Sequence, residues 1–64
     1  MSGEEERARL TRAEAEAWVK AETRSSDRFA RRTVNEAEHG RTPYGMTFDG
    51  ECWTVPAWSL RKRP

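Results

Sequence analysis

Three arginines and an asparagine occur within eight residues, at Arg28, Arg31, Arg32 and Asn35. At about 100° per residue, this spacing places all four side chains on one face of a helix. A guanidinium can donate two parallel hydrogen bonds to guanine, and an asparagine amide can bind adenine in the same way, each worth about 1–3 kcal/mol of discrimination. We therefore predict that this face reads base edges in the major groove of double-stranded DNA.

Residues on both sides of this face are suited to phosphate contacts. Ser25 and Ser26 lie where the helix is expected to begin, so their hydroxyls and the nearby backbone N–H groups can bind a phosphate. Further along the chain, we predict that Arg41, Thr47 and Gly50 contact the flanking DNA backbone or the minor groove.

The charge balance also allows a plainer interpretation. Twelve Lys and Arg residues against eleven Asp and Glu residues leave a net charge of +1, whereas DNA-binding domains are usually clearly basic. On this interpretation, the helix face is a solvated surface with intrahelical ion pairs such as Arg32 with Glu36, each of which stabilises the helix by about 0.2–0.5 kcal/mol. The charge is uneven, however: residues 1–23 are net acidic, and residues 24–43 are net basic. The basic excess indicates where a polyanion would bind.

Catalytic, metal and cofactor chemistry lacks the residues that it needs. One cysteine, Cys52, and one histidine, His39, exclude an intramolecular disulfide and a closed structural zinc site, and no acid–base pair is evident. We predict a partly exposed structural thiol at Cys52 and an exposed imidazole at His39. We expect no enzyme activity, no cofactor and no metal. No apolar run approaches the roughly 20 residues of a membrane span, which predicts a cytoplasmic protein.

Two helices must position the basic face. Thr11 and Glu14 have the spacing of a capping box, which predicts a first helix that begins near Arg12. Ser25, Ser26 and Asp27 are N-cap residues for a second helix that ends at Gly40. On the first helix the predicted apolar stripe is Ala13, Ala17, Trp18 and Ala21. On the second helix the predicted apolar sector is Phe29, Ala30, Thr33, Val34 and Ala37.

A β-hairpin is predicted after Pro43, where the apolar period changes from helical to alternating. Asp49 and Gly50 have the character of a two-residue turn, so Phe48 would pair with Glu51. By the same register, Met46 would pair with Trp53 and Tyr44 with Val55. This places Tyr44, Met46, Phe48, Trp53 and Val55 on one face and Thr47, Cys52 and Thr54 on the other.

The predicted architecture is a small α+β winged helix-turn-helix: two main helices, a two-stranded wing and a short C-terminal segment. Residues 1–9 are expected to form a charged arm or a frayed helix, residues 10–60 the DNA-binding domain, and residues 61–64 a basic tail. We expect the core to include Trp18 and Trp53, with Trp58 and Leu60 as further apolar anchors.

The order of the motifs resembles that of the small excisionases, or recombination directionality factors, of phages and integrative elements, and of related AlpA-like and MerR-like regulators. The segments that carry the resemblance are Leu10-Thr11-Arg12-Ala13-Glu14-Ala15, Arg31-Arg32-Thr33-Val34, Gly40-Arg41-Thr42-Pro43, Gly50-Glu51-Cys52-Trp53-Thr54-Val55-Pro56 and Leu60. The connection after Trp18 and the second helix are both longer than in common members of this family, and the net charge is lower.

The resemblance implies sequence-specific DNA binding at a recombination site, contact with a tyrosine integrase, and cooperation between copies on DNA. We therefore expect an excisionase-type accessory factor or a small transcriptional regulator of a phage or mobile element. The rival hypothesis is a small phage or mobile-element protein that binds and inhibits or adapts another protein, through its mixed-charge surface and an exposed Trp58, without contacting DNA.

Overall fold

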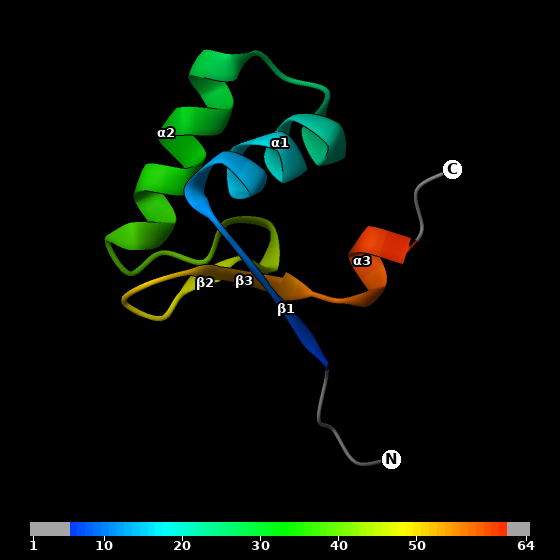
Figure 1. Cartoon of the computed structure of the whole chain (residues 1–64). Helices are drawn as coiled ribbons and strands as arrows, with labels where there is room; N and C mark the ends of the chain where they lie inside the picture. The colour runs from blue at the N-terminus through cyan, green and yellow to red at the C-terminus, as the bar shows by residue number, and fades with distance from the viewer. Residues whose placement is uncertain (1–5, 62–64) are drawn as a thin grey trace.

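The computed structural model describes residues 6–61 of the chain as a small α+β domain (Figure 1). Helices α1 and α2 lie over one face of an antiparallel sheet, and a short helix follows the last strand. In chain order the elements are β1 (Arg7–Leu10), α1 (Arg12–Thr23), α2 (Asp27–Glu38), the 3₁₀ turn η1 (Pro43–Gly45), β2 (Thr47–Phe48), β3 (Trp53–Pro56) and α3 (Trp58–Arg61). None of the helices within residues 6–61 is long and apolar enough to cross a membrane.

The sheet has three strands in the order β1-β3-β2, one more than the two-stranded wing predicted from the sequence. The additional strand, β1, pairs antiparallel with β3, and Leu10 lies opposite Trp53. The expectation of a charged arm or frayed helix over residues 1–9 is therefore wrong for Arg7–Arg9, and residues 1–5 lie outside the described part. Exposed arginines alternate with more buried apolar residues along this strand, but an alternation over only four residues is too short to predict a strand from the sequence.

Helix α1 begins at the predicted position because its first turn is capped. The backbone N–H of Glu14 donates to the Thr11 hydroxyl at 3.2 Å, and the backbone N–H of Thr11 donates to the Glu14 carboxylate at 2.9 Å. This reciprocal pair is the predicted capping box. The helix ends at Thr23 and is followed by the C-cap residue Arg24, which adopts the left-handed conformation with φ 54° and ψ 43°.

The buried face of α1 differs from the predicted one. Its buried residues are Ala15, Trp18 and Val19. The predicted stripe shares only Trp18 with this set, because Ala13, Ala17 and Ala21 are exposed. Three of the four alanines of α1 share the exposed side and only Ala15 lies on the buried side, so the spacing of alanines does not identify the inward sector. The two large apolar residues, Trp18 and Val19, decide it by packing into the core.

Helix α2 confirms most of the predicted pattern. Ser26 is its N-cap and accepts a hydrogen bond from the backbone N–H of Phe29 at 3.3 Å. The buried side chains are Ala30, Thr33, Val34 and Ala37, as predicted. Phe29 is the exception, with 41% of its surface exposed. It lies at the margin of the apolar sector, so its ring projects beside the core instead of into it.

The hairpin has a different register from the predicted one. Phe48 pairs with Trp53, and four residues, 49–52, connect the strands. The Asp49 carboxylate widens the turn by accepting hydrogen bonds from the backbone N–H groups of Glu51 and Cys52, both at 2.9 Å. The predicted pairing is therefore displaced by two residues, a shift that leaves the residues of β2 and β3 on their predicted faces of the sheet.

Tyr44 does not belong to the hairpin, contrary to the predicted pairing with Val55. It lies in η1 with φ 55° and ψ 24°, and 55% of its surface is exposed. A left-handed residue cannot continue an extended strand, so β2 begins only at Thr47. Met46, two residues after Tyr44, is fully buried.

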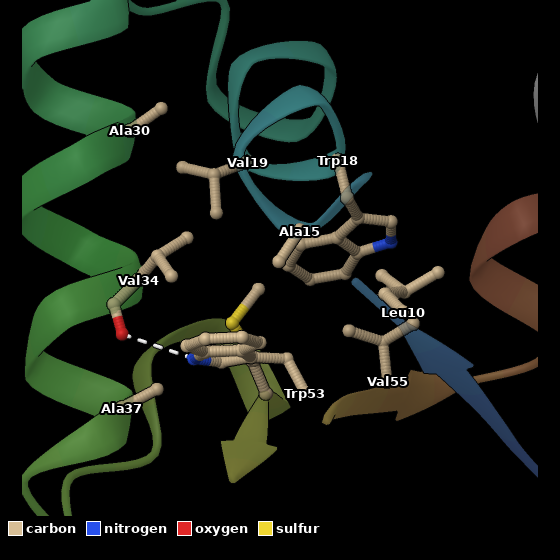
Figure 2. Close-up of a cluster of buried hydrophobic side chains, with 10 residues drawn as sticks. Leu10, Ala15, Trp18, Val19, Ala30, Val34, Ala37, Trp53 and Val55 are labelled. Carbon is tan, nitrogen blue, oxygen red and sulfur yellow. Dashed lines mark hydrogen bonds between the residues drawn. The ribbon is translucent and has the colours of Figure 1, made fainter. Parts of the chain in front are cut away.

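The core lies between the two helices and the sheet (Figure 2). Trp18 and Trp53 are both buried, as predicted, and each indole N–H has a partner. Trp18 donates to the Ser59 hydroxyl at 3.0 Å, and Trp53 donates to the backbone carbonyl of Val34 at 3.1 Å. Phe48 packs against Trp53 with a ring centroid distance of 4.6 Å.

The C-terminal anchors predicted from the sequence are wrong. Trp58 is 50% exposed and Leu60 38% exposed, because α3 turns these side chains away from the core while Ser59 faces inward. Of the predicted basic tail, Arg61 is the last residue of α3, and residues 62–64 lie outside the described part.

Candidate nucleic-acid interface

The outward face of α2 carries the four side chains predicted to read DNA. Its opposite face is buried against α1 and the sheet, so the predicted set is exposed: Arg28, Arg31, Arg32 and Asn35. The burial pattern thus separates α2 into an apolar inner face and a basic outer face, which is the arrangement that base contacts in a major groove require.

Most of the arginines at this face are not engaged with carboxylates. Among residues 6–61, Arg28, Arg31 and Arg41 form no ion pair. Arg32 alone has one, with Glu36, at a long Nε–Oε2 distance of 3.9 Å. The Arg32 side chain is 81% exposed, and a surface pair of this kind contributes little to stability. Three guanidiniums therefore remain available to an anionic ligand.

The turn after α2 brings Arg41 to the same surface. Gly40 has φ +99°, and the backbone N–H of Arg41 donates to the carbonyl of Glu36 at 3.1 Å. This folds the chain back along the end of the helix. An open hollow of about 590 Å³ results, which we call the C-terminal hollow, and it is lined by Arg32, Asn35, Glu36, His39 and Arg41.

The start of α2 forms a second and smaller depression, the N-terminal hollow, of about 200 Å³. It is lined by Ser26, Arg28, Phe29 and Arg32. Ser25, predicted alongside Ser26, is half-buried instead, and its hydroxyl lies 2.6 Å from the hydroxyl of Thr23. Only Ser26 of the two serines therefore joins the arginines.

A carboxylate also lies in the first turn of α2, where it faces α1. Asp27 pairs with Lys20 at 2.5 Å, and its pKa is lowered, chiefly by the hydrogen bond from Lys20 and then by the lysine charge. Arg31 lowers this pKa further by a smaller amount. The negative charge of Asp27 is thus offset by Lys20, which leaves the arginines as the unbalanced charge on the outer face.

A third depression, the aromatic groove, lies between α2 and η1 and has a volume of about 430 Å³. It is lined by Phe29, Arg32, Thr33, Glu36, Pro43 and Tyr44. All three depressions share Arg32, so they form one continuous surface from Ser26 to Tyr44. The sequence patterns did not identify Phe29 or Tyr44 as part of this surface, whereas helical spacing places His39 on the same face as the arginines. For Phe29, its position at the margin of the predicted apolar sector was the one sequence signal that could have indicated exposure.

The predicted wing residues lie elsewhere. The Thr47 hydroxyl is 2.6 Å from that of Thr54 and accepts a hydrogen bond from Arg7 at 3.3 Å. Because the neighbouring Phe48 packs against the core, Thr47 faces the opposite side of the sheet. Gly50 is exposed at the hairpin tip with φ +105°. Neither Thr47 nor Gly50 lines the three depressions around α2.

The hairpin tip is acidic, which disfavours a phosphate contact there. Asp49 and Glu51 both pair with Arg9, at 3.0 and 3.8 Å. The pKa of Asp49 is lowered, first by the backbone N–H groups of Cys52 and Glu51 and more weakly by Arg9. Two carboxylates against one guanidinium leave the tip with a negative balance. Cys52, a free thiol, is half-buried as predicted.

In the part of the chain that the structure describes, no group of three His, Cys, Asp or Glu residues could hold a metal ion. Comparison of the chain with protein-family models, curated proteins and solved structures finds no match.

Proposed function

We propose that this protein binds double-stranded DNA sequence-specifically through the outer face of α2. The observation that carries the proposal is the exposed arginine face, on which Arg28, Arg31 and Arg41 have no ion-pair partner within residues 6–61. Arg28 lines the N-terminal hollow and Arg41 the C-terminal hollow, while Arg31 is exposed on the same helix face outside the depressions. Unpaired guanidiniums in this arrangement suit an anionic ligand with flat hydrogen-bonding edges. In this role α1, the connection over residues 24–26 and α2 act as a helix-turn-helix, and the hairpin as its wing.

The dimensions of α2 suit the major groove. Twelve helical residues span about 18 Å, and a groove about 12 Å wide admits one helix with its side chains. Arg31 and Asn35 lie one helical turn apart on the outer face, where they would read guanine and adenine edges. Arg41, beside the end of α2, would contact the flanking phosphate. The acidic hairpin tip makes Arg41 a better candidate for that contact than Gly50.

The low net charge has a consequence for how binding is achieved. With a net charge of +1, the protein has few surplus positive charges to attract DNA, so nonspecific affinity should be weak. Useful affinity then requires base contacts, together with further copies on DNA or a partner protein. An excisionase-type accessory factor that acts with an integrase, or a small regulator of transcription, would meet this requirement.

The exposure of α3 favours a second candidate function. Trp58 and Leu60 expose half and more than a third of their surfaces. The helix that carries them, α3, lies on the side of the molecule away from α2 (Figure 1). Large apolar side chains exposed together are a common feature of protein-binding surfaces. The second candidate is therefore a protein that binds another protein through α3 and does not contact DNA.

An NMR titration distinguishes the two functions. A duplex is first selected from a random-sequence library with the full chain, and is then added to isotope-labelled protein at two salt concentrations. DNA binding predicts shifts of backbone resonances in residues 26–44 that weaken at higher salt. Selection that enriches no duplex, or shifts confined to α3, would contradict the DNA-binding proposal.

A further inference from the structure

Two aromatic side chains lie exposed beside the arginines of α2. Phe29 is 41% exposed and Tyr44 is 55% exposed, and both line the aromatic groove together with Pro43. Isolated exposed apolar residues are common on protein surfaces. Here, however, two rings from different elements meet in one depression, which gives the basic surface an apolar edge.

The backbone holds Tyr44 in this outward position. Tyr44 has φ 55°, a left-handed backbone conformation that residues other than glycine and asparagine seldom adopt. The turn around it is closed by the backbone N–H of Met46, which donates to the carbonyl of Pro43 at 2.9 Å. Because Met46 is fully buried, it anchors the turn to the core while Tyr44 stays at the surface.

The charges around Phe29 indicate the kind of ligand that fits. Arg28 and Arg32 share the N-terminal hollow with Phe29, and neither hollow nor groove holds a carboxylate other than Glu36. Glu36 is half-buried and lies 3.9 Å from Arg32, which reduces its repulsion of an anion. This surface therefore suits a ligand that presents negative charge next to a small apolar group.

We propose that Phe29, supported by Tyr44, contacts the C5-methyl group of a thymine and so determines part of the DNA sequence that the protein prefers. The proposal rests on the proposed DNA-binding function. The thymine methyl is the apolar group that a duplex exposes in its major groove, and phenyl rings contact it. Phe29 lies in the first turn of α2, the part of a recognition helix that approaches base edges.

The neighbouring arginines extend the inference to a second base. Arg28 and Arg32 line the same small hollow as Phe29, so a guanine bound by either guanidinium would lie close to the thymine along the duplex. The preferred site should therefore contain a thymine next to, or one step from, a guanine. An aromatic contact with thymine also adds affinity that does not depend on salt.

The test begins with the duplex that the full chain selects from a random-sequence library. Each thymine of that duplex is replaced in turn by deoxyuridine, which removes only the methyl group. We expect one replacement to weaken wild-type binding by about fourfold, the effect of burying one methyl group. The Phe29→Ala variant should bind the thymine and deoxyuridine duplexes equally, and Tyr44→Ala should reduce the difference between them.

Leu60→Ala provides the matched control, because it truncates an apolar side chain of similar exposure on α3. It should retain the wild-type preference for thymine. Circular dichroism spectra check that every variant is folded. Equal binding of wild type to all deoxyuridine duplexes, or an unchanged preference in Phe29→Ala, would overturn this inference while leaving DNA binding intact. Failure of the wild type to select any duplex would overturn both proposals.

Discussion

The indole N–H of Trp53 donates a hydrogen bond to the backbone carbonyl of Val34 at 3.1 Å (Figure 2). This bond crosses the core from β3 to the middle of α2, and both residues are buried. The Arg12 guanidinium lies 5.8 Å from the centroid of the same indole ring, and Arg12 pairs with Glu38 at the end of α2 at 3.6 Å. Trp53 thereby sets the position of α2, and of its outer face, relative to the sheet.

Replacement of Trp53 by phenylalanine should therefore destabilise the fold. The variant keeps an aromatic ring but loses the bond to Val34, which costs about 1 kcal/mol, with an added loss from the smaller ring. Urea denaturation followed by circular dichroism measures the change. Trp58→Phe, at a half-exposed indole, is the control and should change the free energy of unfolding less. An equal loss in the two variants would contradict the role given to Trp53.

The N-cap of α2 should be important for stability. Ser26→Ala removes the acceptor for the backbone N–H of Phe29 and should lower the free energy of unfolding by about 1 kcal/mol. Thr42→Ala is the matched control, because Thr42 precedes η1 without a side-chain capping bond. Thermal unfolding curves of both variants test this, and a Ser26→Ala curve that overlays the wild type would argue against the cap.

The end of α1 offers a stabilising substitution. Arg24 has φ 54°, a left-handed conformation that costs a residue with a side chain about 1–2 kcal/mol, and glycine adopts it freely. Arg24→Gly should raise the free energy of unfolding by up to about 1 kcal/mol, because flexibility gained in the unfolded chain offsets part of the relief. Arg31→Gly, in the middle of α2, should lower it by about 1 kcal/mol. Chemical denaturation compares the two, and the same sign for both would contradict this account.

Stability should fall in acid partly through Asp49. Its pKa in the folded chain lies below the ordinary value of 3.8, because backbone N–H groups of Cys52 and Glu51 bind the carboxylate. A lowered pKa contributes stability above pH 3.8 that is lost as the pH falls through the folded-state pKa. Asp49→Asn cannot titrate, so its free energy of unfolding should decrease less steeply below pH 3.8 than that of the wild type. Parallel curves for the two proteins would be inconsistent with this role.

DNA binding should depend on the geometry of the Arg31 side chain as well as on its charge. Arg31→Ala should weaken binding to the selected duplex by about 1–3 kcal/mol and leave the fold intact, since Arg31 is exposed. Arg31→Lys keeps the charge but loses the paired donors, so it should relax base preference while keeping the salt dependence. Fluorescence anisotropy with the selected duplex and single-base variants measures both effects. Wild-type affinity in Arg31→Ala would exclude Arg31 from the interface.

Local interactions explain which features of the fold could be predicted. Thr11, Glu14 and Ser26 act on backbone groups within three residues, so the starts of both helices follow from the sequence. The register of the hairpin does not, because a shift of two residues preserves the alternation of apolar side chains. The four-residue loop is distinguished from the predicted two-residue turn by the hydrogen bonds that the Asp49 carboxylate accepts from residues 51 and 52, and by the backbone bond from the Asp49 N–H to the Cys52 carbonyl.

In the candidate site, too, some features follow from local sequence and others from tertiary packing. The sequence by itself determined that Arg28, Arg31, Arg32 and Asn35 share a helix face, because helical period is a local property of the chain. The tertiary structure decided which residues join that face. The turn at Gly40 brings Arg41 alongside it, and η1 brings Tyr44 toward Phe29. Both depend on how Met46 and Trp53 pack against α2 in the core, and such contacts between distant segments are set by burial, which no local pattern encodes.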